Sequence, residues 1–142
     1  MDPFVVTLFA HTLGDFFFQP KKMAIEKTSP GTDGFCTCIY HCCIYALCFC
    51  ALGCLATQGM VGWHIYIFNA IVFANHFVID RWNLAQKWLN FIHGRNFIDD
   101  WKKQGPFVQI EVPFDCIVYT VVDNAMHLMI NYYALVLLGG KS

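Results

Sequence analysis

Charged residues are scarce in this 142-residue sequence. Asp, Glu, Lys and Arg together make up 13% of it, against about 25% in a typical soluble domain. The sequence also lacks a basic stripe and has a formal net charge of −1, so its charge does not indicate nucleic-acid binding. Hydrophobic residues make up 57%, and the mean hydropathy is +0.47. These values favour an integral membrane protein over the alternative, a soluble all-helical protein with a large dry core.

Paired Cys-x-x-Cys spacing is absent, although the chain has 8 cysteines. A thiolate metal site would normally show that spacing. Most of the cysteines crowd one apolar stretch from Cys36 to Cys54, and residues of one helix cannot easily form disulfides with one another. We therefore interpret them as small apolar side chains facing lipid or neighbouring helices. A cleavable signal peptide is not expected, because Asp2 stands where a basic segment should be.

Four apolar runs predict membrane spans, at about residues 4–19, 35–56, 61–80 and 113–138. The first run is short for a span and stops at Gln19-Pro20. The second and third are separated by a short uncharged turn, which predicts an antiparallel hairpin. Pro113 suits the first turn of the last helix.

Residues 81–112 have a mixed composition in which Trp and Leu recur at roughly helical spacing. This pattern predicts an amphipathic helix in the membrane interface, or alternatively a connecting helix packed on the bundle. The predicted fold class is therefore all-α. We expect a single membrane domain over residues 1–142, an integral membrane four-helix bundle with an additional amphipathic interfacial helix between helices three and four.

The basic residues are distributed unevenly between the predicted connections. Eight of the nine fall in the first and third connections: Lys21, Lys22, Lys27, Arg81, Lys87, Arg95, Lys102 and Lys103. The positive-inside rule then places both connections in the cytoplasm and both termini outside. We expect a multi-pass protein of the inner (cytoplasmic) membrane, with the lipid bilayer as its main partner.

Three His/Asp pairs lie inside the apolar runs, each with a spacing of four residues: His11/Asp15, His76/Asp80 and Asp123/His127. Composition alone predicts about 0.7 such pairs. A four-residue step puts both side chains on one helix face, where they can share a ligand. An unpaired Asp at the bilayer centre costs roughly 2.5–3.5 kcal/mol, so these acids need a compensating partner.

The predicted topology brings these residues and His41 to the inner half of the bundle, as in helical bundles that build metal sites. The candidate ligands are His11, Asp15, His41, His76, Asp80, Asp123 and His127. Imidazole and carboxylate ligands suit zinc, manganese or iron, and seven candidates allow one or two ions. Asp15 and His41 are candidate catalytic residues, with His41 as ligand or base. The candidates for orienting ligands or holding substrate are Gln19, Asn75, Arg81 and Asn124.

Simpler interpretations stay open for each of these residues. Taken alone, an intramembrane His such as His41 is more often a hydrogen-bonding group between helices. A His/Asp pair can equally be a buried salt bridge that locks two helices together. His64, beside Trp63, and His93, before Gly94, are left out of the site, because they look interfacial and solvated.

The run from His11 to Gln19, continuing to Met23-Ala24 and Lys27, resembles the opening signature of a family of small membrane proteins from bacteria and phages. This is the domain-of-unknown-function family numbered 3307. The later marks of that family also match in order: His41, the His76–Asp80 segment, and Asp123 with His127. Two positions depart from the pattern, since Asn83 stands where the family has Lys and Asn124 where it has Gln.

The leading functional hypothesis is a membrane-embedded metal-binding protein that acts as a metal-dependent hydrolase. We expect a phospholipid or another phosphorylated amphiphile as substrate, because the basic segment can hold anionic headgroups at the cytoplasmic leaflet. The resemblance implies a bacterial or phage origin, and a broader likeness to membrane-bound metal-dependent hydrolases is fold-level analogy. The alternative is a non-enzymatic protein, either an ion or proton pathway or an assembly subunit. A homo-oligomer is compatible with either hypothesis.

Overall fold

The computed structural model describes residues 2–56, 62–93 and 108–139, and these residues are helical with no strands. The helices are α1 (Pro3–Thr12), α2 (Lys21–Glu26), α3 (Thr32–Ala56), α4 (Trp63–Arg81), α5 (Leu84–His93) and α7 (Val108–Gly139). A π-helical turn, η1 (Leu13–Phe17), continues α1. The predicted all-α fold class is therefore confirmed.

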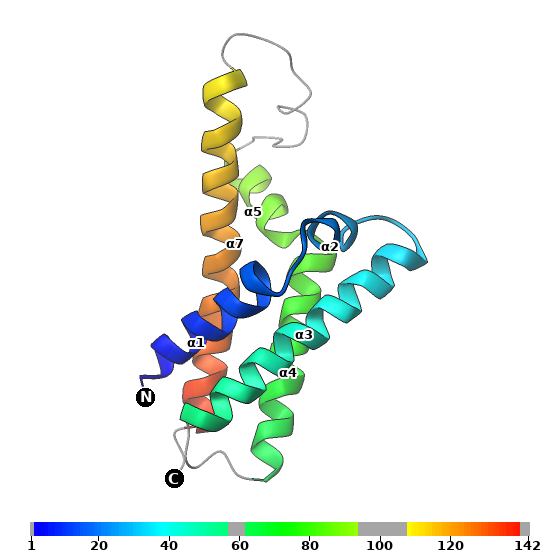
Figure 1. Ribbon diagram of the computed structural model, residues 1–142. Helices are drawn as coiled ribbons and strands as arrows, with labels where there is room; N and C mark the ends of the chain where they lie inside the picture. Colours follow the sequence, from blue (N-terminus) through cyan, green and yellow to red (C-terminus); the bar gives the residue numbers. More distant parts are fainter. Residues whose placement is uncertain (1, 57–61, 94–107, 140–142) are drawn as a thin grey trace.

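Four apolar helices, α1 with its continuation η1, α3, α4 and α7, pack pairwise in a ring (Figure 1). α1 packs on α3, α3 on α4, α4 on α7, and α7 on α1. The short helices α2 and α5 lie against α3 and α7 respectively. The buried apolar core takes two residues from each helix of the ring: Val6, Ala10, Tyr45, Phe49, Phe68, Val72, Ala134 and Leu135.

The start of α1 is fixed by its own sequence. The Asp2 carboxylate accepts hydrogen bonds from the backbone N–H groups of Phe4 at 2.7 Å and Val5 at 3.2 Å. Pro3 occupies the first helical position, where the missing N–H is no loss. α1 then changes to the π-helical turn, with a Phe18 N–H to Leu13 carbonyl bond of 2.9 Å. π-Helical turns are frequent at functional sites.

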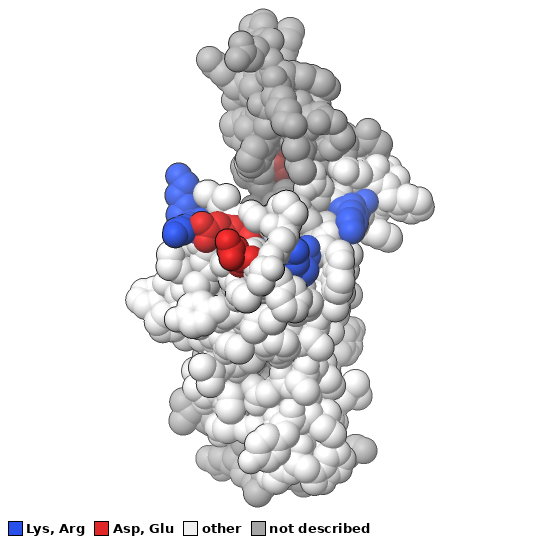
Figure 2. Space-filling model, turned by 90° about the vertical axis from the view of Figure 1, so that its right-hand side faces the viewer, with Lys and Arg blue, Asp and Glu red and all other residues white. Residues whose placement is uncertain are grey.

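Two helices are long and apolar enough to cross a membrane: Thr32–Cys54 within α3 and Phe114–Gly139 within α7. Pro3–Phe17 is apolar but shorter. Only 28% of the most apolar stretch in the first span and 22% in the second are buried within the chain. Figure 2 shows charged side chains gathered at the height of α2, while the lower half of that face has none.

The structure corrects one helix boundary. α7 begins at Val108, so the prediction that Pro113 lies in the first turn of the last helix is wrong. Pro113 falls in the second turn, where a proline removes one backbone hydrogen bond without ending so long a helix. The amphipathic helix expected in 81–112 is α5, while residues 94–107 lie outside the described part.

α5 is amphipathic, with its apolar residues on one broad face. Part of that face buries Ala85 and Leu89 against the bundle, since α5 packs on α7. The rest exposes Trp88, Phe91 and Ile92. The alternative expected for this segment, a helix packed on the bundle, is therefore found, and a position in the membrane interface stays a prediction.

Close packing of η1 on α3 requires a glycine, which gives the first testable prediction. A Cβ atom at Gly14 would lie 2.5 Å from Cδ2 and 3.3 Å from Cα of Tyr45. We expect Gly14→Ala to destabilise the protein by about 1–3 kcal/mol, since Tyr45 cannot move away in the core. Thermal unfolding in detergent, followed by circular dichroism, measures this.

Gly53→Ala is the matched control, because a Cβ there would lie 3.6 Å from Phe68, an ordinary contact. This variant should unfold at or above the wild-type temperature, since Ala favours a helix by up to about 1 kcal/mol over Gly. Equal unfolding temperatures for Gly14→Ala and wild type would contradict the tight contact.

Candidate metal centre

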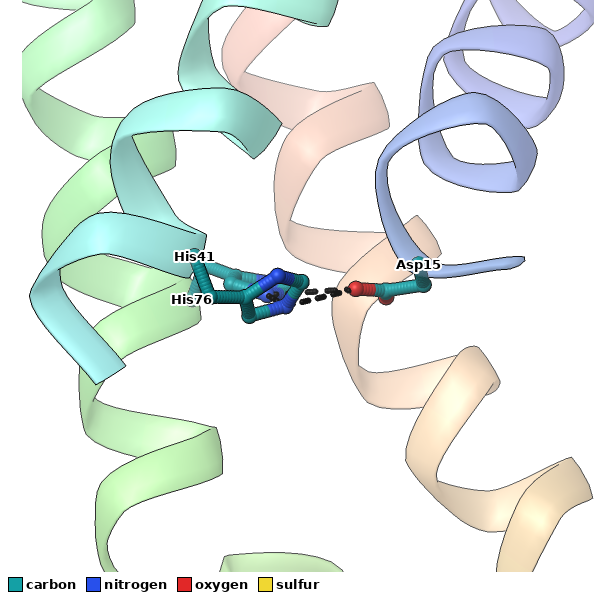
Figure 3. A group of neighbouring side chains, drawn as sticks. All are labelled: Asp15, His41 and His76. Carbon is teal, nitrogen blue, oxygen red and sulfur yellow. Dashed lines mark hydrogen bonds and ion pairs between the residues drawn. The ribbon is translucent and has the colours of Figure 1, made fainter. Parts of the chain in front are cut away.

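Two histidines and one aspartate from three segments face one another inside the ring. His41 on α3 and His76 on α4 bring their Nε2 atoms within 2.8 Å. Asp15 on η1 places its Oδ1 3.0 Å from the first of these atoms and 3.3 Å from the second. Figure 3 shows both rings pointing toward this carboxylate. Both rings are fully buried, and these three residues form a group that can hold a metal ion.

Asp80 approaches the same two rings. Its Oδ2 lies 3.0 Å from Nε2 of His76 and 3.4 Å from Nε2 of His41. Oδ1 of Asp15, Oδ2 of Asp80 and the two Nε2 atoms form the four-atom set. Ligands at tetrahedral corners about 2.0–2.1 Å from a zinc ion would be about 3.3–3.4 Å apart. Each carboxylate oxygen lies 3.0–3.4 Å from both ring nitrogens, so a small outward movement would fit the two rings and one carboxylate around an ion.

The available protons also favour a cation at this point. A neutral imidazole carries one N–H on either nitrogen, so each facing Nε2 atom presents a lone pair when its ring proton is on Nδ1. The carboxylates of Asp15 and Asp80 accept hydrogen bonds and donate none when ionised. Two imidazole nitrogens that face each other beside carboxylate oxygens therefore match the requirements of a divalent metal ion.

The pair on α7 lies beside this four-atom set. His127 is fully buried, and its Nε2 makes no hydrogen bond to the described residues; it lies 3.4 Å from Oδ1 of Asp80. Asp123 is farther away, with Oδ2 3.9 Å from the same nitrogen. His76, Asp80 and His127 form a second, overlapping group that can hold a metal ion. Asp80 thus has one oxygen toward each group.

His11 lies one layer outside the four atoms. Its Nδ1 is 2.8 Å from the Tyr45 hydroxyl and 3.2 Å from Oδ2 of Asp15, and its Nε2 is hydrogen-bonded to Asn124. Both ring nitrogens are therefore engaged by protein groups. This geometry favours a role in orienting Asp15, and metal ligation by His11 stays a prediction.

The predicted supporting residues divide into three kinds. Gln19 and Asn124 contact the cluster directly. The side-chain amide nitrogen of Gln19 lies 2.9 Å from Nε2 of His41. Oδ1 of Asn124 is hydrogen-bonded to Nε2 of His11. Asn75 is one step removed, since its amide donates to Asn131 at 3.4 Å. Arg81 faces another way and donates to the Ser29 carbonyl at 3.0 Å, tying the α2–α3 connection to the end of α4.

Tyr45 and Asn131 support the cluster but escaped the sequence analysis. The Tyr45 ring stacks on His76, with centroids 3.6 Å apart and planes 15° from parallel. Asn131 donates to the Tyr45 hydroxyl at 2.9 Å. A signal was present, because each residue follows a candidate ligand by four positions, Tyr45 after His41 and Asn131 after His127.

Lys27 was also not predicted as a site residue, although the segment that resembles the family signature includes it. Its Nζ lies 2.6 Å from Oδ2 of Asp80, between the α2–α3 connection and the end of α4. Burial alone would lower the pKa of the Lys27 ammonium group, but the carboxylates of Asp80 and Asp15 outweigh it and raise that pKa above its usual value. Lys27 is therefore a fixed cation at the edge of the cluster.

Comparison with known families assigns the chain to one of them. Residues 4–138 match the family described as Protein of unknown function (DUF3307), and the chain belongs to that family. No curated protein and no solved structure matches the chain.

The buried contacts of Tyr45 predict that its hydroxyl is needed for stability. Tyr45→Phe leaves the Asn131 amide without its acceptor and removes a partner of His11. A buried polar group left unpaired costs about 1–3 kcal/mol, so the midpoint of unfolding should fall. Tyr40→Phe is the control, because Tyr40 is 62% exposed on the same helix. An equal fall in the midpoint of unfolding for Tyr45→Phe and Tyr40→Phe would contradict the buried network.

Proposed function

We propose that this protein is a multi-pass membrane protein that binds a divalent metal ion and uses it to hydrolyse a phosphorylated or lipid substrate. The convergence of His41, His76, Asp15 and Asp80 is the observation that carries the proposal. A membrane location is supported by the two apolar helices, which expose large hydrophobic side chains along most of their length. We propose the inner membrane, with both termini outside and the basic connections in the cytoplasm.

In the proposed arrangement α1 with η1 and α4 cross the bilayer beside α3 and α7, which makes four spans. The ring packing of these helices supports this arrangement, since α1 and α4 each contact both longer helices. The cluster then lies at the same end of the ring as α2. The concentration of charged side chains at the height of α2 supports a position of this end at the cytoplasmic headgroups.

The donor set selects the metal. Imidazole nitrogens and carboxylate oxygens suit zinc, manganese or iron. The group of Asp15, His41 and His76 offers a position for one ion, and the overlapping group of His76, Asp80 and His127 offers a position for another. A metal ion here would supply Lewis acidity toward a phosphoryl oxygen and a water molecule.

The chain's own residues supply the rest of the chemistry. Asp15 and Asp80 carry the negative charge that holds the ion, and His11 and Lys27 fix the orientation of these two carboxylates. Gln19 holds His41, whose buried ring is the candidate general base when it is not bound to the ion.

Metal content tests the proposal directly. Purified wild-type protein should contain about one equivalent of a divalent metal, whereas His76→Ala and Asp15→Asn should lose it, because each removes one of the four converging atoms. Asp123→Ala should lose less, since Asp123 is outside the four-atom set. Elemental analysis by mass spectrometry gives the stoichiometry.

His93→Ala is the matched control for the metal measurement, because His93 is exposed at the end of α5. It should retain wild-type metal content. Equal metal content in wild type, His76→Ala and Asp15→Asn would refute a metal centre at this cluster.

Turnover is the second test. Protein reconstituted in phospholipid vesicles should release a phosphate or phosphorylated headgroup at a rate that a chelator abolishes and added zinc or manganese restores. Metal-dependent ion flux without lipid turnover would instead support the alternative, an ion or proton pathway. Absence of both would favour a structural or partner-binding role.

A further inference from the structure

A pocket of about 370 Å³ lies where the α2–α3 connection meets the end of α4. Its described lining consists of Thr28, Pro30, Phe35, Phe77, Arg81 and Trp82. None of the residues of the four-atom set is among them. The pocket is therefore a part of the molecule that the proposed chemistry does not use.

The pocket and the metal centre lie along different faces of α4. Phe73, Phe77 and Arg81 follow one another at four-residue steps, which places them along one face of the helix. His76 and Asp80 have the same step one position earlier, so their face is turned by about 100° around the helix axis. α4 thus carries candidate metal ligands on one face and an aromatic row that ends in an arginine on the next.

Aromatic rings form the apolar wall of the pocket. The Phe77 ring meets Phe35 of α3 edge to face, with centroids 5.7 Å apart, and meets Trp82 in the same way at 5.9 Å. Phe73 continues the row one turn along α4, with its ring parallel to that of Phe77. Phe35 and Trp82 are 44% and 50% exposed. The row from Phe73 to Arg81 is about 12 Å long, at a rise of about 1.5 Å per residue.

Arg81 is the single charged side chain in the described lining of the pocket. Its Nη1 donates a hydrogen bond of 3.0 Å to the Ser29 carbonyl, a neutral partner, and no ion pair with a described residue balances its charge. A guanidinium group has five N–H donors in a planar fork, so donors remain for an anion. Phosphate oxygens match the geometry of this fork. The unbalanced positive charge therefore favours an anionic occupant.

We propose that this pocket holds an anionic phospholipid, with its phosphate on Arg81 and an acyl chain along Phe77 and Phe73. A cation at one end of an apolar row is complementary to an amphiphile with a negative headgroup, and basic pockets at the cytoplasmic ends of membrane helices bind such lipids. Trp82 lies beside Arg81 and suits the depth of the headgroups. The inference rests on the proposed function for the membrane location alone, since this lipid is bound as a ligand and not hydrolysed.

Native mass spectrometry of the full-length protein in detergent measures this binding directly. The probes are dioleoyl phosphatidylglycerol, which carries one negative charge, and dioleoyl phosphatidylcholine, which has the same chains and phosphate but no net charge. The wild-type protein should bind its first molecule of phosphatidylglycerol about fivefold more tightly, as expected for one arginine that faces an anionic headgroup. Glycerophosphoglycerol has the same headgroup without acyl chains and, added as a competitor, should not displace the lipid.

Two variants assign the preference to Arg81. Arg81→Gln removes the positive charge and should bind both lipids equally. Arg81→Lys keeps the charge without the planar fork, so part of the preference should remain. Lys87→Gln is the matched control, because it removes one positive charge from an exposed position of α5 outside the pocket. It should keep the wild-type preference, which separates the pocket from a general effect of net charge.

The aromatic wall has its own test. Phe35→Ala should weaken the binding of both lipids several-fold and leave the preference between them intact, because Phe35 would contact the acyl chain and not the headgroup. Phe91→Ala is the control, since Phe91 is 83% exposed on α5 and does not line the pocket. Unchanged binding of both lipids by Phe35→Ala would contradict an acyl chain along this wall.

The outcomes separate this inference from the proposed function. Equal binding of the two lipids by the wild-type protein, an unchanged preference in Arg81→Gln, an equal loss in Lys87→Gln, or displacement of the lipid by glycerophosphoglycerol would each overturn the lipid pocket. Arg81→Gln should keep the wild-type metal content, because Arg81 is outside the four-atom set. A preference that depends on Arg81 in a protein without bound metal or turnover would support the pocket, and the proposed hydrolase alone would then fail.

Discussion

Burial of carboxylates in an apolar ring is the constraint on which the rest of the structure depends. Each ionised Asp removed from water costs free energy that only a nearby positive charge or several donors can offset. Asp15 and Asp80 meet this requirement by pointing at the same two imidazoles, while His11 and Lys27 approach from outside. The helices must therefore pack so that these groups meet.

Much of the site could be predicted from spacing alone. A four-residue step is a local property of a helix, so His76 and Asp80 had to share a face wherever α4 packed. The prediction that this face meets His41 and Asp15 needed only the general tendency of buried acids to find partners. The resemblance to the family rests on the same residues in the same order.

The parts that sequence did not predict depend on tertiary contacts. Lys27 looks like any basic residue of a connection, and only the return of α4 to the α2–α3 connection places Asp80 within 2.6 Å of it. The close approach of η1 to Tyr45 at Gly14 is another tertiary contact, which no periodicity reveals. Hydropathy likewise placed the start of α7 too late, because the helix continues beyond its apolar stretch.

The order of the converging residues along the chain has a consequence for biosynthesis. Asp15, His41, His76 and Asp80 all precede α5, so a growing chain contains the complete set before α7 has been translated. α7 would then close around a centre that has already been assembled. Packing of α7 against α1 and α4 then becomes the step that completes the ring around side chains already present in the growing chain.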